Sequence, residues 1–350
     1  MITIQDMPDD VLELIYSNLD IVDSVSTNIA LHRKIIKAKI VNICNIFSFI
    51  KIHESYHKYV NVVFNINLDY LDKYKNVYGV TIQSKSNLKL EDFNNIKKLD
   101  CFSSSNIDFS LLTNLTELNC SYTDVTNIDI LTNLKKLSCF NTKIKNVSKL
   151  VNLIDLVCME TDIEYVNNLV NLTNLDCSDC TKINNVDNLV NLTKLGIDNT
   201  RVSRVNHLTK LIGLSCYETN VENVYNLINL KYLQCSFTKI VYVNNLVNLI
   251  KLHCESTEVD NVSQLVNLTI LNCKNTKIKY VNSLTKLTSL HCNFTEVDDV
   301  SNLVNLEYLH CANSKIKDVS KNIKLSVLIC MNTSIIITEE MRKKIYNISN

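Results

Sequence analysis

Hydrophobic residues recur along most of this chain with a period of 19 residues. In the stretch that begins at Leu134, they stand at positions 134, 137, 139, 144, 147 and 150, and Leu153 opens the next repeat. Leu137 and Cys139 are two residues apart, which places both side chains on one face of a short strand. From Ile144 onward the spacing is three, which predicts tight 3₁₀-like or irregular turns rather than a full α-helix. A fixed period of this size predicts a solenoid with one strand in each repeat.

One position of the repeat is almost always cysteine. It is cysteine at 101, 120, 139, 158 and 177, and again at 216, 235, 254, 273, 292, 311 and 330. Ile197 takes the remaining position, one residue late, because the segment Cys177–Thr181 contains a single insertion. We expect these side chains to lie in the core as small hydrophobic groups. In-register side chains on parallel strands give a poor disulfide dihedral angle, so free thiols are predicted.

Threonine stands three residues after the cysteine position in most repeats. It does so in ten of thirteen, at 123, 142, 161, 200, 219, 238, 257, 276, 295 and 333, while Ser104, Ser314 and Cys180 fill the rest. A hydroxyl both donates and accepts hydrogen bonds. The column therefore predicts a ladder, in which each hydroxyl donates to a carbonyl of one repeat and accepts from an N–H of its neighbour. Exposed turn threonines without a structural role are the alternative.

The repeats and their flanks divide the chain into three parts. The apolar spacing continues one period upstream of Leu99, and more loosely for a second period. Residues 1–60 lack the period, so we place a separate helical domain or cap there and the solenoid at 61–337. In residues 338–350, Thr338 is a good N-cap, with acidic residues after it and basic residues further on. This end of the chain is therefore predicted to be a capping helix.

The pattern L-x-x-L-x-C-x-x-T-x-I-x-x-V-x-x-L resembles the leucine-rich repeat, in an internalin-like form that is shortened by three residues on its convex side. The resemblance implies an α/β solenoid: an arc with a parallel β-sheet on the concave face and short 3₁₀ or irregular segments on the convex face. Repeat arrays present long surfaces, and one scaffold serves many different partners. The pattern therefore predicts binding to a protein and does not name the target.

The first residues carry a different signature. Leu12, Ile15 and Leu19 share one face of a helix expected over about residues 9–19, and Pro8 suits its start. The stretch resembles the opening of the F-box, L-P-x-x-x-L-x-x-I-x-x-x-L-D, with methionine for the first leucine. The tryptophan that F-boxes carry late in the motif is absent. The resemblance implies docking on the Skp-type adaptor of a cullin–RING ubiquitin ligase, and an amphipathic cap over the first repeat is the alternative. The residues implied in adaptor docking are Met7, Pro8, Leu12, Ile15 and Leu19.

Composition narrows the function classes. Lysine plus arginine equals aspartate plus glutamate, 36 against 36, so the chain lacks the basic field that non-specific nucleic-acid binding needs. No apolar run reaches the roughly 18 residues of a membrane span, and the start shows no secretory signal. Fourteen cysteines, together with Asn-X-Ser/Thr sequons throughout the repeats, favour a reducing compartment, so a cytoplasmic location is expected. The abundance of asparagine, isoleucine and lysine is similar to that of repeat proteins of giant DNA viruses. For a viral protein, the expected location would be the cytoplasm of the host cell.

The chain offers little catalytic chemistry. No glycine-rich phosphate loop or H-E-x-x-H motif occurs, and the one C-x-x-C, Cys177–Cys180, supplies only half a zinc site. His253, His291 and His310 share one outward column of the predicted sheet. Imidazoles that lie close together bind metals, whereas the simpler interpretation makes them solvated residues of a binding face. We therefore expect no enzymatic activity, no cofactor and no metal, and a monomer with protein partners. An enzyme built on the histidine column would need a metal.

Outward aromatic residues complete the candidate binding surface. Aromatic side chains are enriched at the hot spots of protein interfaces. The candidate target-binding residues on the concave face are Phe102, Phe140, Tyr217, Tyr232, His253, His291, Tyr308 and His310.

Overall fold

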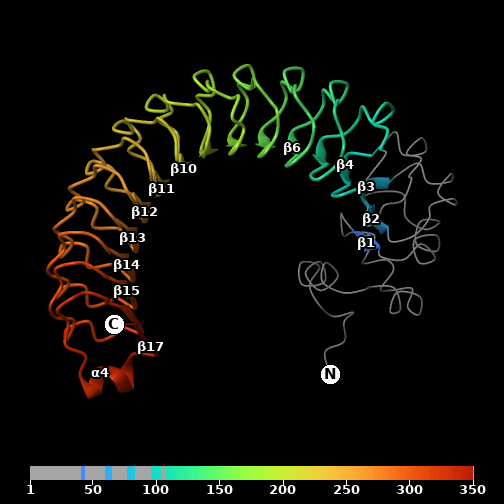
Figure 1. Ribbon diagram of the computed structural model, residues 1–350. Helices are drawn as coiled ribbons and strands as arrows, with labels where there is room; N and C mark the ends of the chain where they lie inside the picture. Colours follow the sequence, from blue (N-terminus) through green and yellow to red (C-terminus); the bar gives the residue numbers. More distant parts are fainter. Residues whose placement is uncertain (1–40, 44–59, 65–76, 83–95, 105–106, 350) are drawn as a thin grey trace, which may run out of the picture. The chain divides into compact units, whose positions relative to one another are not determined.

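The computed structural model describes residues 41–43, 60–64, 77–82, 96–104 and 107–349 (Figure 1). Its contacts divide the chain into two compact units, Met1–Ile163 and Glu164–Asn350. The helix predicted over residues 9–19 and the five adaptor-docking residues lie outside the described residues.

Within the first unit, the described strands follow one another in chain order, and each pairs in parallel with the next. The parallel sheet includes β1, which lies upstream of residue 61, where the sequence pattern places the start of the solenoid. The strands of this unit are β1 (Val41–Ile43), β2 (Val60–Phe64), β3 (Val77–Ile82), β4 (Lys98–Asp100), β5 (Glu117–Asn119), β6 (Lys136–Ser138) and β7 (Asp155–Val157).

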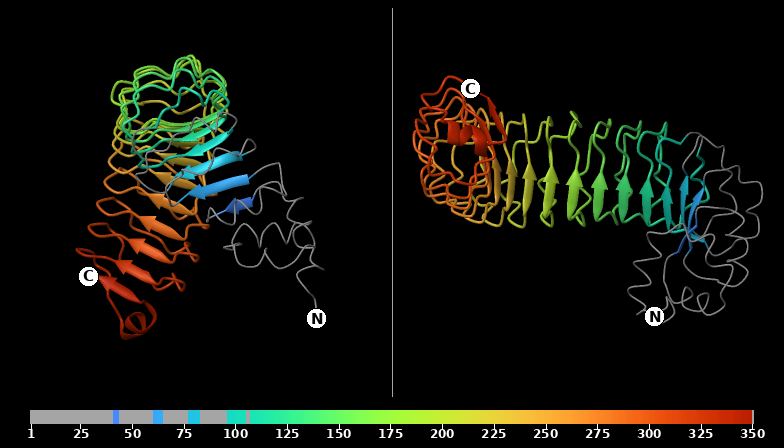
Figure 2. Two further views of the ribbon diagram at one scale, coloured as in Figure 1. Left: turned by 90° about the vertical axis from the view of Figure 1, so that its right-hand side faces the viewer. Right: turned by 90° about the horizontal axis from the view of Figure 1, so that it is seen from below.

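The second unit repeats the same parallel pairing, and Figure 2 shows the strands of each unit side by side. Leucine pairs with leucine from strand to strand, as Leu214 does with Leu233. Its elements are β8 (Asn174–Asp176), β9 (Lys194–Gly196), β10 (Gly213–Ser215), β11 (Tyr232–Gln234), β12 (Lys251–His253), β13 (Ile270–Asn272), β14 (Ser289–His291), β15 (Tyr308–His310), β16 (Val327–Ile329), α4 (Glu339–Lys344) and β17 (Asn347–Ser349).

The core consists of layers that bury the same positions of each repeat. In each strand from β4 to β16 the central leucine is buried between two more exposed neighbours, and the next residue but one, usually cysteine, is buried as well. The return segments contain single turns, such as Leu150 N–H donating to Val147 O at 2.9 Å and Leu153 N–H donating to Leu150 O at 3.1 Å. The parallel sheet and the non-helical return side are therefore confirmed for the described residues.

All thirteen described cysteines are free and buried, namely the twelve of the cysteine column and Cys180. Cys139 N–H donates to Val157 O of the next repeat at 2.8 Å, which extends the ladder beyond the three-residue strand. Some thiols add a weaker bond of the same kind, as Cys101 Sγ does to Asn119 O at 3.2 Å. Burial raises the pKa of Cys120 and of Cys273 to about 12. The thiols act as small apolar groups, as the sequence predicts.

Slow thiol modification is expected from this burial. A thiol reacts as the thiolate, and burial both withholds the reagent and disfavours the charged form. In native protein, the column cysteines should react with an aromatic disulfide reagent far more slowly than a free thiol does. In denaturant all fourteen cysteines of the chain should react. Rapid native modification of the mid-array cysteines would show that the column is open to water.

The threonine side chains do not form the predicted ladder between repeats. Each threonine hydroxyl donates to the carbonyl three residues earlier in its own repeat, as Thr142 Oγ1 does to Cys139 O at 2.8 Å. The short side chain lies beside that carbonyl, whereas the neighbouring strand is about 4.8 Å away. Longer side chains bridge the repeats instead: Asn152 Nδ2 donates to Thr132 O and Asn248 Nδ2 to Ile228 O, both at 2.9 Å. Asparagine therefore forms the ladder that threonine was expected to form.

The helix predicted at the C-terminal end is present but short. Helix α4 begins after Thr338, whose hydroxyl accepts a hydrogen bond from Met341 N–H at 3.2 Å. The chain does not stay helical to its end, because β17 follows and pairs in parallel with β16. The capping segment is thus a short helix and one more strand.

Asn322 is a polar exception in this region. It takes the position that Leu303 holds one repeat earlier, it is buried, and its Oδ1 has no hydrogen-bond partner. Its Nδ2 donates to the carbonyls of Val300 and Leu303. Because a buried acceptor without a partner costs about 1–3 kcal/mol, Asn322→Leu should raise the free energy of unfolding by about 1 kcal/mol. Urea denaturation measures this, and a destabilised variant would contradict the interpretation.

Candidate functional site

The strand face is the surface formed by the outward side chains of the strands and by the residue that follows each cysteine position. The alternation in every three-residue strand, with a buried leucine in the middle, fixes which side chains reach this surface. In the second unit the strands β10–β15 lie on the inner side of the bend and the return turns on the outer side (Figure 1). The candidate residues of each unit lie on this face.

In the first unit the strand face carries a row of aromatic rings. Phe102 and Phe140 are bridged by Tyr122, whose ring centroid lies 5.2 Å from that of Phe102 and 4.8 Å from that of Phe140. Both contacts are edge-to-face, an arrangement that the charge distribution of aromatic rings favours. Phe102 and Tyr122 are about half exposed. The structure therefore brings Phe102 and Phe140 into one cluster through a residue that the sequence analysis did not select.

In the second unit, the first part of the strand face carries the carboxylates of Asp176 and Asp198. Asp198 accepts hydrogen bonds from Ser215 Oγ and, at 2.7 Å, from Tyr217 N–H. Burial raises the pKa of Asp198, and nearby Asp176 adds to the rise. Gly196 leaves room for Asp176, because a Cβ at residue 196 would stand 2.6 Å from Asp176 Oδ1. The single insertion and the missing cysteine of the array fall in this same stretch.

The middle of this face is mixed in character. Tyr232 lies 5.9 Å from the Lys251 ammonium, which is positioned over its ring. Glu255 pairs with Lys274 at 2.7 Å. Aromatic rings and charged pairs on one face are features of surfaces that recognise protein side chains.

Histidines and a tyrosine gather further along. Tyr308 stacks on His291 with centroids 4.8 Å apart and an angle of 21° between the rings. His310 meets His291 edge-on, at 5.9 Å between centroids. His253 is in the same column, two strands before His291. All of these side chains are partly exposed.

The three histidines favour the neutral form. Burial lowers the pKa of His253, His291 and His310 below the ordinary value of 6.5. Neighbouring positive charge adds to this effect, from Lys251 at His253 and from Lys274 at His310. The face is therefore rich in neutral imidazole at neutral pH.

A pH-dependent stability follows from these shifts. The unfolded chain takes up protons at higher pH than the folded chain, so the histidine contribution is complete above about pH 6.5. This contribution to stability is lost as the pH falls from about 6.5 through the lowered pKa values of the three histidines in the folded state. The triple variant H253N/H291N/H310N should lose less stability than wild type between about pH 7.5 and pH 5. Equal losses in urea denaturation would contradict the assignment.

The eight candidates are divided between the two units. Phe102 and Phe140 belong to the first unit, and the other six belong to the second. Tyr217 contacts Phe237, a ring 5.3 Å away that the sequence analysis also missed. Like Tyr122, Phe237 stands two residues after a cysteine, and this spacing is the signal that identifies both.

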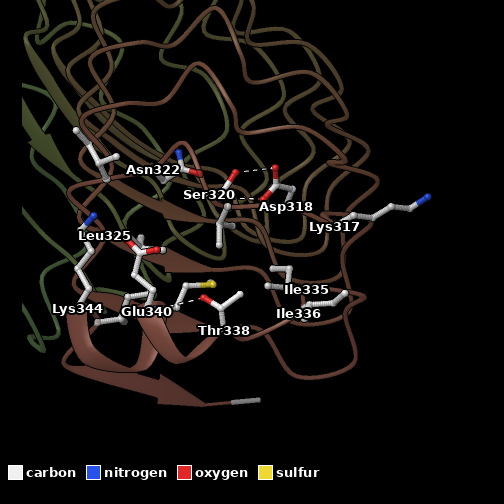
Figure 3. A pocket seen from close by; sticks show the side chains of 14 residues that line it. Lys317, Asp318, Ser320, Asn322, Leu325, Ile335, Ile336, Thr338, Glu340 and Lys344 are labelled. Carbon is white, nitrogen blue, oxygen red and sulfur yellow. Dashed lines mark hydrogen bonds between the residues drawn. The ribbon is translucent and has the colours of Figure 1, made fainter.

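The described residues hold no group of three histidine, cysteine or acidic side chains placed to bind a metal. No helix among them has both the length and the apolar character to cross a membrane. A hollow of about 520 Å³ lies beside α4, where Asp318 accepts a hydrogen bond from Ser320 Oγ at 2.9 Å (Figure 3). Its walls combine apolar side chains with polar and charged ones, and it belongs to the cap rather than to the strand face.

Solved structures resemble this chain closely in fold and distantly in sequence. An internalin of Listeria monocytogenes is 23% identical with a TM-score of 0.64, over 75% of this chain and 88% of that one. The functional domain of InlJ from the same species, described as including a cysteine ladder, is 22% identical with a TM-score of 0.60, over 86% and 69% of the two chains. A leucine-rich-repeat protein of Leptospira interrogans is 17% identical with a TM-score of 0.58, over 95% and 93%.

No protein-family model and no curated protein matches the sequence. The likeness to these structures concerns the fold, because the identities are low. Together with the parallel strands and the 19-residue period, it establishes that the repeats adopt the leucine-rich-repeat fold.

Proposed function

We propose that this protein is a non-enzymatic binding protein that holds a target protein on its strand face. The observation that carries the proposal is the set of partly exposed aromatic and imidazole side chains that the strand faces of the two units present over a buried core. Side chains held in place by a buried core lose little further freedom when a partner binds. The solved leucine-rich-repeat structures support the scaffold role by analogy of fold. Free thiols throughout the core are consistent with a cytoplasmic location.

The N-terminal segment gives the proposal its finer form. Its F-box-like residues would dock on a Skp-type adaptor, and the repeats would present the target to a cullin–RING ubiquitin ligase. The chemistry of ubiquitin transfer then belongs to other subunits. This part rests on the sequence pattern at Met7, Pro8, Leu12, Ile15 and Leu19.

Adaptor binding tests the finer form directly. Purified full-length chain is immobilised, and a purified Skp-type adaptor is passed over it. Wild type should bind, Leu12→Asp should abolish binding, and Glu13→Ala, a change at a variable position of the motif, should retain it. A wild-type chain that never binds the adaptor ends the ligase proposal and leaves the scaffold proposal standing.

The alternative is a ligase-independent scaffold in which the N-terminal segment only caps the array. Under this alternative, removal of residues 1–40 uncovers the first repeats and lowers the unfolding midpoint of the array. Under the receptor proposal, the same deletion removes adaptor binding and leaves the repeats folded. Adaptor affinity and thermal unfolding of one deletion variant separate the two.

A further inference from the structure

Two histidines occupy equivalent positions on neighbouring strands of the second unit. His291 ends β14, His310 ends β15, and the two residues are direct partners in the sheet register. Adjacent strands lie about 4.8 Å apart, and the two ring centroids are 5.9 Å apart with an angle of 63° between their planes. The imidazoles therefore stand side by side on the strand face and do not stack on each other.

One ring of this pair is held in place by a neighbouring side chain. Tyr308 stacks on the His291 ring at 4.8 Å, which restricts its rotation. The cation that acts on His310 is Lys274, and that ammonium is paired with the Glu255 carboxylate at 2.7 Å. The positive charge beside the pair is thereby largely neutralised.

The separation of the two rings suits a shared metal ion. Zinc–nitrogen bonds are about 2.0–2.1 Å long, so two imidazole nitrogens on one tetrahedral ion lie about 3.4 Å apart, with ring centroids about 5 Å apart. The 5.9 Å found between the centroids of His291 and His310 is longer than this, so the His310 ring must turn toward His291 for both nitrogens to reach one ion. A metal binds the neutral imidazole, which is the ordinary form of a histidine side chain above about pH 6.5.

Although the sequence pattern predicts no metal, we propose that His291 and His310 together bind one divalent transition-metal ion of the zinc and copper class on the strand face. Two protein ligands leave at least two positions of a tetrahedral ion for water or for a side chain of a bound partner. The site lacks a third ligand among the described residues, so it binds metal more weakly than a closed structural site does. Its use as a metal-bridged contact to a target rests on the proposed function, whereas metal binding itself does not.

His253 provides the matched control. It lies in the same column as His291 and is similarly half-buried, with Asn272 between the two in the register. Being two strands from His291 and three from His310, it is about 10 Å or more from the pair. A substitution at His253 removes an imidazole that acts on His291 only through its charge, and it leaves both proposed ligands in place.

The test titrates untagged, full-length protein with Cu²⁺ at about pH 7.5, because copper binds imidazole most tightly among these metals. Electron paramagnetic resonance reports nitrogen ligation and stoichiometry, and Zn²⁺ competition follows. Wild type should take up one more equivalent than H291N/H310N. Each single variant should weaken binding about tenfold or more, and His253→Asn should leave it unchanged. Circular dichroism confirms that every variant is folded.

Two results would overturn the proposal. One is equal copper stoichiometry and affinity in wild type and in folded H291N/H310N. The other is a loss in His253→Asn as large as that in the single variants of the pair. The adaptor experiment does not involve metal, so failure here leaves the proposed function untouched.

Discussion

Leu252→Ala is expected to lower the free energy of unfolding by about 2–5 kcal/mol. Leu252 is fully buried at the centre of β12, between Leu233 of β11 and Leu271 of β13. The backbone on both sides is fixed by the parallel ladder, so the layers cannot close around the missing methyl groups. Urea denaturation followed by circular dichroism measures the loss. Tyr242→Ala is the control, because Tyr242 is 74% exposed and its removal should change stability by less than about 0.5 kcal/mol. A Leu252→Ala variant as stable as that control would place the leucine column outside the core.

Cys235→Ser is expected to destabilise the protein by about 1–3 kcal/mol, because it buries a hydroxyl among apolar side chains. Cys235 has no exposed surface, and burial raises the pKa of its thiol well above the usual value. Cys235→Val should be nearly neutral, since Ile197 already places a larger aliphatic side chain in the same column.

Chemical denaturation of the two cysteine variants checks this pair of expectations. A serine variant with wild-type stability would mean that the column faces water and that the strand register is inverted. A count of free thiols on unfolded wild-type protein completes the measurement. Fewer than the fourteen cysteines of the sequence, in protein purified without oxidant, would reveal disulfides.

The repeat itself could be predicted from sequence because each layer buries the same positions. The two-residue spacing of Leu137 and Cys139 identifies a strand, and the 19-residue period identifies its neighbours. The backbone of the turn could not be predicted in this way. Thirteen non-glycine residues there have positive φ, among them Tyr122 and Phe237 at 58° and 59°. The left-handed conformation is unfavourable for a residue with a Cβ. It is tolerated here because the N–H of eleven of these residues donates to a carbonyl of the next repeat, as Tyr122 N–H does to Phe140 O at 2.8 Å.

The inter-repeat ladder shows the same limit. Threonine and asparagine both form periodic columns, and the pattern alone does not say which side chain reaches the next layer. The reach of the side chain decides it, as Asn267 Nδ2 contacts Val247 O at 3.1 Å. Where lysine replaces asparagine, Lys210 and Lys286 donate to the Asn191 and Asn267 side chains instead, each at 2.7 Å.

For the candidate site, the sequence identified the columns but not the contacts across them. The period places His291 and His310 in one column. Tyr308 stacks on His291 from the neighbouring strand, two residues before the position that aligns with it. Such diagonal contacts depend on side-chain rotamers, which a repeat pattern does not contain.

The central claim is that the strand face holds the target, and matched tyrosine variants test it most directly. Full-length tagged chain is expressed in eukaryotic cells, and co-purified proteins are quantified by mass spectrometry. Tyr232 and Tyr308 lie on the strand face, whereas Tyr242 and Tyr280 are exposed residues outside the strands. The Y232A/Y308A variant should lose the proteins that wild type retains, and Y242A/Y280A should keep them. Retention of these proteins by Y232A/Y308A would contradict the account.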